Sequence, residues 1–329
     1  MLKRLTLLLF PLCYINAQIA LPTFHAVHKP HSVVATSGTL TFTNCSGTGN
    51  NGPTQSQVNS SYSGTPLDGD VTINTQGIQE WTIPYTTTYT IEVWGAEGGE
   101  GASHNSTIAG KGAYMIADFS LSSGTVLKII VGQQPTGTNS GGGGGSFVVK
   151  SDNTPLIIAG GGGGAPGSCC GSPQNGGNGT TNNAGTDASG NSSCSDGTGG
   201  SGGNGGNGGS SLGAGGGGGF SGNGANGVNS SSTEGRGGKS FLNGGVGGTG
   251  YNSNFYGGFG GGGGSGRLNN AYTAGSGGGG GGYSGGGGSC AAQNWGSGGG
   301  GGSYSLSSTN TSSSASGLWE SHGKVVITY

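Results

Sequence analysis

The sequence predicts an all-β fold in which an antiparallel sandwich of short strands adjoins an ordered array of extended glycine helices. Glycine accounts for 86 of the 329 residues, while only 29% of residues are hydrophobic and 7% are charged, which is far from average globular composition. Short strand patterns come first, near-pure glycine runs follow, and one more strand pattern occupies 323–329. The runs are 141–145, 160–164, 215–219, 260–264, 277–282, 285–288 and 298–302.

Glycine runs of this kind fit either a disordered linker or a lattice of polyglycine II helices. Collagen is excluded, because glycine does not recur at every third position with proline between. In polyglycine II the N–H and C=O groups point outward, and neighbouring helices can approach closely because no Cβ intervenes. A strand at 323–329 after a flexible tail would have no partner, so we expect it to pair with the N-terminal strands and to fix both ends of an ordered glycine region.

The strands of the sandwich are predicted by alternation of buried and exposed residue types. Tyr89, Ile91 and Val93 share one face of the clearest strand, while Glu92 and Trp94 lie on the other. Short strands at this spacing favour an antiparallel sandwich. The expected strands are 39–44, 71–74, 78–83, 88–95, 113–121, 126–131, 146–150 and 156–159.

A single helix is expected after Gly52. Pro53 suits the first helical position, and Val58 and Tyr62 lie one turn apart on a face turned toward the sheet.

The N-terminus is typical of an exported protein. Residues 1–17 combine a basic start with a short apolar core and Ala17 as a cleavage point, so they predict a signal peptide. Residues 18–36 follow as a polar leader, and 37–329 as one glycine-rich domain, with the sandwich over about 37–160 plus 318–329 and the glycine lattice over about 141–305. His25, His28 and His31 share one face of an extended leader and could bind a metal, although a solvated leader is the favoured interpretation.

Cysteines beyond the signal segment are odd in number, which leaves one unpaired or intermolecular. In an exported protein they are expected to form disulfides. Either Cys169 or Cys170 pairs with Cys194 in this interpretation, and Cys290 could connect a glycine run to the same loop. A zinc site is disfavoured, because no CxxC pair or nearby histidine is present.

Large aromatic residues interrupt the glycine region more often than a linker would need. We favour packing at the rim of the lattice as their role, since aromatic side chains usually bury their area within the fold. The alternative is a contact surface, because aromatic residues dominate binding hot spots. The candidates for such a surface are Tyr251, Phe255, Tyr256, Tyr272 and Trp295.

Several motifs in order resemble the glycine-rich extracellular domain of the anaplastic lymphoma kinase and leukocyte tyrosine kinase receptors. They are Phe42-Thr43-Asn44-Cys45, Gly52-Pro53-Thr54-Gln55, Tyr62-Ser63-Gly64-Thr65, Gly77-Ile78-Gln79-Glu80-Trp81, Val93-Trp94-Gly95-Ala96-Glu97-Gly98-Gly99, Ile130-Val131-Gly132-Gln133-Gln134 and His322-Gly323-Lys324-Val325-Val326. The resemblance covers roughly 37–329. It implies a jelly-roll sandwich, similar to the tumour necrosis factor fold, fused to polyglycine II helices, an arrangement similar to modules of bacterial surface proteins and phage tail adhesins.

The chain departs from that family at two places. The second cysteine of the family's opening motif corresponds to Val58 here, so Cys45 loses its partner. The family also carries acidic residues late in the glycine region, and this chain has none between Glu234 and Glu320. The family's cytokine site is therefore not expected here.

The function that the sequence favours is a non-enzymatic, secreted or cell-surface binding module for an extracellular protein or glycan. A structural matrix or coat protein is the first alternative, and a receptor kinase ectodomain without its kinase part is the second. A net charge of −2 provides no electrostatic attraction to nucleic acid, and no segment is apolar enough for a membrane span. No kinase, nucleophile-elbow or cofactor motif occurs in a fitting structural context. Asp68 and Asp70 could offer carboxylates to calcium, but a turn into the strand at Val71 is favoured.

Overall fold

The computed structural model describes residues 37–101, 107–136, 140–167, 174–190, 194–228, 235–250, 253–266, 275–290 and 296–329. The chain divides into two compact units, Met1–Val34 and Ala35–Tyr329. The first lies wholly outside the described residues, and with it the predicted signal peptide and most of the leader with its three histidines.

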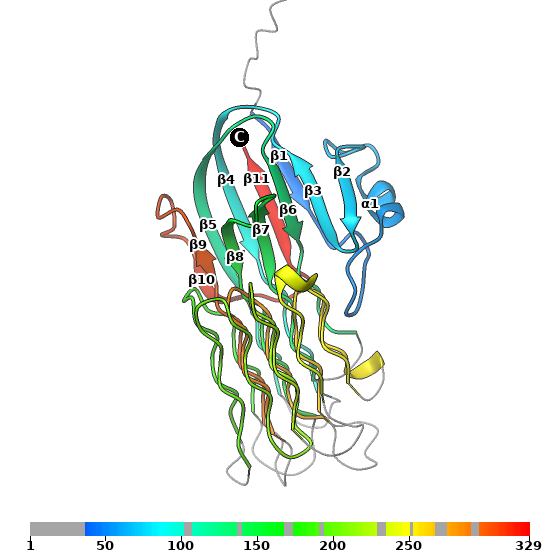
Figure 1. Cartoon of the computed structure of the whole chain (residues 1–329), viewed down its shortest axis with the longest axis vertical. Coiled ribbons are helices and arrows are strands. Elements are labelled where there is room, and N and C mark those ends of the chain that lie inside the picture. The colour runs from blue at the N-terminus through cyan, green and yellow to red at the C-terminus, as the bar shows by residue number, and fades with distance from the viewer. Residues whose placement is uncertain are drawn as a thin grey trace, which may run out of the picture. The chain divides into compact units, whose positions relative to one another are not determined.

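Two antiparallel sheets form the upper part of the second unit (Figure 1), which confirms the all-β sandwich. Sheet A has the order β1-β11-β4-β5-β10, with bounds Thr39–Phe42, Lys324–Thr328, Thr87–Trp94, Gly112–Leu121 and Ala315–Trp319. Sheet B has the order β2-β3-β6-β7-β8-β9, with bounds Val71–Thr75, Ile78–Thr82, Val126–Ile130, Ser146–Lys150, Pro155–Ala159 and Tyr304–Ser305.

The main hydrophobic core is built by strands that alternate as the sequence predicts. In β4, Tyr89, Ile91 and Val93 have no exposed surface, while Glu92 and Trp94 are half-buried on the other face. The last strand, β11, lies between β1 and β4 and pairs with both. The expectation that the C-terminal segment needs the N-terminal strands is therefore confirmed.

The helix α1 spans Gln55–Tyr62 and buries Val58 and Tyr62 as expected. Its start differs from the prediction, since Pro53 precedes the helix and Thr54 is the N-cap. The Thr54 side chain accepts from the Gln57 backbone N–H, and the Gln57 side chain reaches back to the Thr54 N–H. This reciprocal capping box satisfies two backbone donors. A helix beginning at Pro53 would have Gly52 as its N-cap, which has no side chain to accept a hydrogen bond.

Two strands were not anticipated, β9 and β10. β9 has only two residues, and β10 contains Gly317, a residue type that strands disfavour, and pairs with β5 through a shifted register. Their strand conformation comes from the edges of sheets A and B that they extend, and not from their own pattern.

The glycine-rich segments between Ser140 and Ser303, apart from β7 and β8, are here called the glycine bundle. They continue from one end of the sandwich as long segments lying side by side (Figure 1). Segment 277–282 shows how they are joined. Its backbone N–H groups donate to 296–302, 140–145 and 215–219 in turn, and the same order repeats from Gly280.

The carbonyl groups of 277–282 point to a different set of neighbours. They accept from segments 160–164, 260–264 and 285–289. Segment 277–282 thus bonds to six others through its backbone, and its bonds recur at every third residue. A strand in a β-sheet bonds to only two neighbouring strands, and its backbone groups point to them alternately, with a period of two. The period of three along 277–282 therefore differs from that of a sheet.

The spacing in the bundle excludes side chains from its interior. A Cβ added to Gly280 would lie 2.2 Å from the Gly161 carbonyl oxygen, and one added to Gly279 would lie 2.0 Å from the Gly286 oxygen. Backbone hydrogen bonds therefore take the place of a hydrophobic core there.

Aromatic residues from the bundle pack onto the outer face of sheet B. Phe220 stacks on Phe241 at 5.5 Å and Tyr283 on Tyr304 at 4.6 Å between ring centroids, while Phe241 lies 5.4 Å from Phe147 of β7. Phe241 and Phe259 are buried. These rings fill the junction between bundle and sheet, in line with the predicted packing role.

Candidate functional site

The outer face of sheet A carries a cluster of aromatic and charged side chains, here called the aromatic face: Trp94, Tyr114, Trp319 and Lys324. The registers Trp94↔Tyr114 and Lys324↔Trp94 place β5 and β11 residues on either side of Trp94. All four residues are half-buried. The cluster therefore follows from strand pairing and from the alternation that turns these positions away from the core.

The contacts within the aromatic face are close. Trp94 lies 4.7 Å from Tyr114 and 5.8 Å from Trp319 between ring centroids. The Lys324 ammonium lies 4.1 Å from the Trp94 centroid and 4.7 Å from that of Trp319, within the range of a cation–π interaction. These contacts hold the side chains in fixed positions before any partner arrives.

Tyr114 connects the aromatic face to an acidic residue. Its hydroxyl donates to Glu92 Oε2 at 2.7 Å. Burial, followed by the Glu92 carboxylate, raises the pKa of Tyr114. The hydroxyl is therefore a neutral donor at physiological pH.

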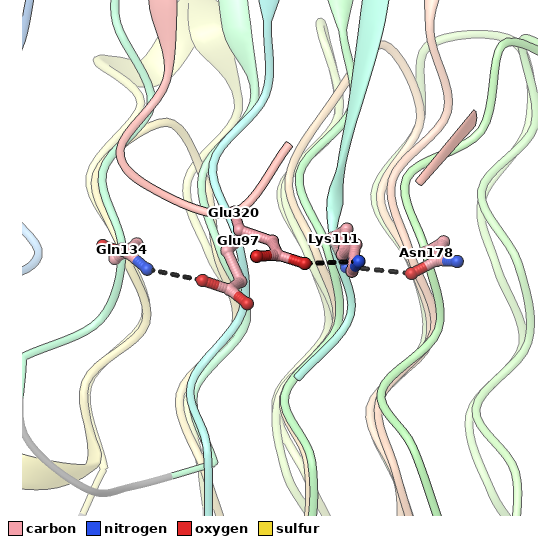
Figure 2. A network of polar contacts seen from close by, with 5 residues as sticks. All are labelled: Glu97, Lys111, Gln134, Asn178 and Glu320. Atoms are coloured by element: carbon pink, nitrogen blue, oxygen red, sulfur yellow. Dashed lines mark hydrogen bonds and ion pairs between the residues drawn. The ribbon is translucent and has the colours of Figure 1, made fainter. Parts of the chain in front are cut away.

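A polar network lies where the sandwich meets the glycine bundle (Figure 2), and one of its members, Glu320, directly follows Trp319 of the aromatic face. Gln134 Nε2 donates to Glu97 Oε2 at 2.8 Å, Lys111 pairs with Glu320, and the Lys111 backbone N–H donates to Asn178 Oδ1 at 2.9 Å. We call these five residues the junction network.

The turn between β10 and β11 is fastened to this network. The Glu97 N–H donates to the Ser321 carbonyl at 3.0 Å, and the Gln134 N–H donates to His322 Nδ1 at 3.0 Å. Trp319 Nε1 donates to the His322 carbonyl at 2.6 Å. The turn that carries Trp319 and leads to Lys324 is therefore held by backbone and side-chain bonds.

Two titratable groups here are shifted by burial. Burial, with smaller contributions from Glu100 and Glu320, raises the pKa of Glu97, against the opposing effects of Gln134 and Lys111. Burial lowers the pKa of His322 below 6.5, which suits an Nδ1 atom that accepts a hydrogen bond. The Lys111–Glu320 pair is well exposed, with 35% and 59% of the side chains accessible, so it contributes little to stability.

The sequence-predicted contact surface is only partly described. Tyr251, Tyr272 and Trp295 lie outside the described residues. Phe255 is 1% exposed, so its ring packs inside the bundle and is not available to a partner. Tyr256 is half-buried.

Cys194 and Cys290 form a disulfide, with Cα atoms 6.1 Å apart. The expected pairing of Cys194 with Cys169 or Cys170 is therefore wrong, because the bundle brings Cys194 next to Cys290, 96 residues away in the sequence. Cys169 and Cys170 themselves lie outside the described residues. Cys45 is buried and free, as its missing partner predicted.

Asp68 and Asp70 belong to turns leading into β2. The Asp68 carboxylate accepts from the Gly64 N–H at 2.9 Å, and the backbone N–H groups of both residues bond three residues back along the chain. Within the described ranges, no group of three or more metal-ligating side chains comes together.

Sequence reasoning missed the aromatic face, although a signal for it was present. Trp94 occupies a solvent-side position in the clearest alternating strand, where a large ring is unusual. Its neighbours Trp319 and Lys324 lie near the end of the chain, and only the pairing of β11 with β4 and of β10 with β5 brings them to Trp94.

Comparison with known proteins gives a partial similarity. No protein-family model matches the chain. The chain is 36% identical over 105 residues to the leukocyte tyrosine kinase receptor of Mus musculus, a match that covers 31% of this chain and 12% of the receptor. The chain thus spans a small part of that receptor's length, and the match supports a distant relationship to it. Among the described residues, no helix is both long and apolar enough to cross a membrane.

Proposed function

We propose that this protein is a non-enzymatic, secreted or cell-surface module that binds an extracellular protein or glycan on a rigid scaffold. The observation that carries the proposal is the fixed aromatic face, mounted on a sandwich that is braced by the glycine bundle. Aromatic side chains dominate binding hot spots, and positions held by neighbouring contacts lose little freedom when a partner binds.

The scaffold is proposed to be a jelly roll carrying polyglycine II helices within one domain, 37–329. Polyglycine II turns once every three residues, so hydrogen bonds should change direction by a third of a turn at each residue. The repeat along 277–282 supports this assignment. Such a lattice transmits little motion, because each segment is bonded to neighbours on every side.

An extracellular location is proposed from independent features. The sequence of residues 1–17 has the pattern of a signal peptide. The disulfide between Cys194 and Cys290 suits an oxidising compartment, and the partial similarity to a receptor supports the same location.

The test uses Trp319→Ala with Leu318→Ala as its matched control. Leu318 precedes Trp319 on β10 and is 54% exposed, so both changes remove apolar surface from one strand. The fluorescently labelled mature protein is titrated onto cultured cells of the source and onto an immobilised glycan panel. We expect Trp319→Ala to weaken binding at least tenfold, the size of a hot-spot loss of about 1.4 kcal/mol or more, and Leu318→Ala to leave it unchanged.

A third variant tests the loop surface that the sequence suggested. If Tyr256→Ala abolishes binding while Trp319→Ala does not, the partner contacts the bundle and the aromatic face is only structural. Circular dichroism of each variant shows whether the fold persists. A protein that binds no cell and no glycan would count against the proposal as a whole.

A receptor-like ectodomain is the second candidate, favoured by the partial match to the leukocyte tyrosine kinase receptor. It predicts a natural product larger than 31.4 kDa in the membrane fraction of the source cells. Detection of the native protein by immunoblot, in membrane and medium fractions, separates the two candidates.

A further inference from the structure

The C-terminal end of β11 lies at the end of the sandwich that is distant from the glycine bundle (Figure 1). A cleft opens beside it. Its volume is about 460 Å³, within the range of small-molecule sites. The lining includes Leu40, Asp70, Trp81, Tyr85 and Tyr329. None of them belongs to the aromatic face or to the junction network.

The floor of the cleft is apolar, because Leu40 and Trp81 belong to the main core and are only 4% exposed each. The walls are the half-buried rings of Tyr85 and Tyr329, whose centroids lie 5.8 Å apart with an angle of 44° between the ring planes. Two tilted rings over an apolar floor form an open aromatic corner.

Both rings are held in place before any ligand binds. The Tyr329 backbone pairs with Gly38 in both directions, at 2.8 and 3.0 Å. A Cβ on Gly38 would lie 2.9 Å from the Tyr329 ring, so the ring lies directly over a residue that has no side chain. On the other side, the buried Tyr89 hydroxyl donates to the Tyr85 carbonyl at 2.8 Å and accepts from the Tyr85 N–H at 3.3 Å.

Among the described residues that line the cleft, Asp70 is the one with a charged side chain. It is exposed at the rim, and its N–H donates to the Leu67 carbonyl at 3.1 Å. Its carboxylate influences a side chain of the cleft, because it helps to raise the pKa of Tyr329. Burial is the largest cause of that shift, followed by Tyr85 and then by Asp70. Ring faces and a carboxylate together give the cleft a negative potential with no basic lining residue to offset it.

We propose that this cleft binds an alkylammonium group, such as that of choline or of a lysine side chain. The cation would lie against the faces of Tyr85 and Tyr329, its alkyl groups on the floor of Leu40 and Trp81, and its charge opposite Asp70. A saccharide fits less well, because it is uncharged and gains no ionic attraction from the Asp70 carboxylate. This site is independent of the function proposed above, because it lies on other strand ends and uses other residues.

The test compares choline with 3,3-dimethylbutan-1-ol, an uncharged molecule of the same shape. Binding of each to the mature protein is followed by calorimetry and by tyrosine NMR signals, with glucose and Nα-acetyl-lysine methylamide as further ligands. We expect millimolar binding of choline or of the lysine derivative, at least fivefold tighter than binding of the uncharged isostere. Whichever ammonium binds more tightly identifies the source of the group.

Two variants localise the effect. Asp70→Asn should weaken ammonium binding about tenfold, and Asp152→Asn, which removes the same charge from the exposed turn between β7 and β8, should leave it unchanged. Asp70 is exposed, so its variant is expected to fold, and Tyr85→Leu should abolish the ring shifts. Equal binding of the isostere, an unaffected Asp70→Asn protein, tighter binding of glucose, or no binding of either ammonium would each overturn the proposal. None of these results bears on the aromatic face, which is tested through Trp319.

Discussion

Replacing Gly280 by alanine tests whether backbone packing alone holds the glycine bundle together. Gly280 lies in segment 277–282, which bonds to six other segments. A Cβ at this position would lie 2.2 Å from the Gly161 carbonyl oxygen and 2.9 Å from that of Gly162. Both contacts are with backbone, so no side-chain rotation can relieve them.

The size of the effect follows from what must give way. Segments 160–164 and 277–282 are joined by two bonds, from the Gly161 and Gly164 N–H groups to the Gly281 and Gly278 carbonyls, at 2.8 and 2.9 Å. Forcing an extra methyl between packed groups costs about 1–3 kcal/mol, and leaving one or both buried bonds unmade costs about 1–3 kcal/mol each. The sum is about 2–6 kcal/mol if one bond is lost and up to about 9 kcal/mol if both are, which is a large part of the total stability of a typical domain, about 5–15 kcal/mol.

The control is Gly124→Ala, the same substitution where no neighbour is near. Gly124 has φ +86° and no atom within 4 Å of an added Cβ. Its cost is the left-handed backbone conformation of alanine, about 1–2 kcal/mol. Both variants lose the same flexibility in the unfolded chain, so their difference isolates the steric contact.

Urea denaturation followed by tryptophan fluorescence measures both variants against the wild type, and hydrogen exchange of residues 277–282 shows where the loss arises. We expect Gly280→Ala to be less stable than Gly124→Ala by at least about 2 kcal/mol, with faster amide exchange across the bundle. Two results would contradict this reasoning: equal stability of the two variants, or rapid amide hydrogen exchange of residues 277–282 in the wild type. Either would mean that close backbone packing does not hold the glycine bundle together.

Three further predictions concern the junction, the disulfide and the core. Burial lowers the pKa of His322 below 6.5, so the unfolded chain takes up the proton first and the free energy of unfolding falls as the pH drops below that value. His322→Asn should therefore show a smaller decline of the urea midpoint with falling pH than the wild type. Any contribution of Glu97 is the same in both proteins and cancels in the comparison. Reducing the disulfide between Cys194 and Cys290, which are 96 residues apart, should cost about 2–5 kcal/mol, and a Cys194→Ser protein should match the reduced wild type and be insensitive to reductant. Tyr62→Phe should lower the unfolding free energy by about 1–3 kcal/mol, because the buried hydroxyl donates to the Gln79 side chain at 2.6 Å; a loss below 0.5 kcal/mol in urea titration would contradict this.

Much of the sandwich could be predicted from local pattern. The alternation through Tyr89, Ile91 and Val93 identified a strand and its buried face, because side chains of a strand alternate whatever it pairs with. Predicted and observed strand ends agree within a residue or two. The remaining differences arise because pairing with a neighbouring strand, and not residue type, decides where a strand ends. β9 and β10 escaped prediction because β9 is only two residues long and Ala-Ser-Gly-Leu-Trp in β10 shows no clear alternation of apolar and polar residues; both strands depend on the sheet edge that they extend.

The candidate site was hardly predictable from the sequence. Trp94 and Trp319 are separated by more than two hundred residues, and nothing local indicates that Lys324 lies over both rings. Of the aromatic residues predicted to form a contact surface, Phe255 is buried. Residue type alone could not show this, because an aromatic ring in a glycine-rich region can serve either in packing or in contact with a partner. The cleft at Tyr85 and Tyr329 could not be predicted from the sequence either, because it is formed by β1, β3 and the end of β11, which are far apart in the sequence.

The sequence by itself determined that glycine, and not apolar side chains, fills the second half of the chain, and that the strands before and after it belong to one sandwich. These properties reside in residue type and in local periodicity. Only the tertiary structure decided which segments surround 277–282, which cysteines pair, and which side chains gather at the outer face of sheet A. Runs of identical residues carry no information about their neighbours, so the order of the bundle has to come from the sandwich and the turns that fix where each run begins and ends.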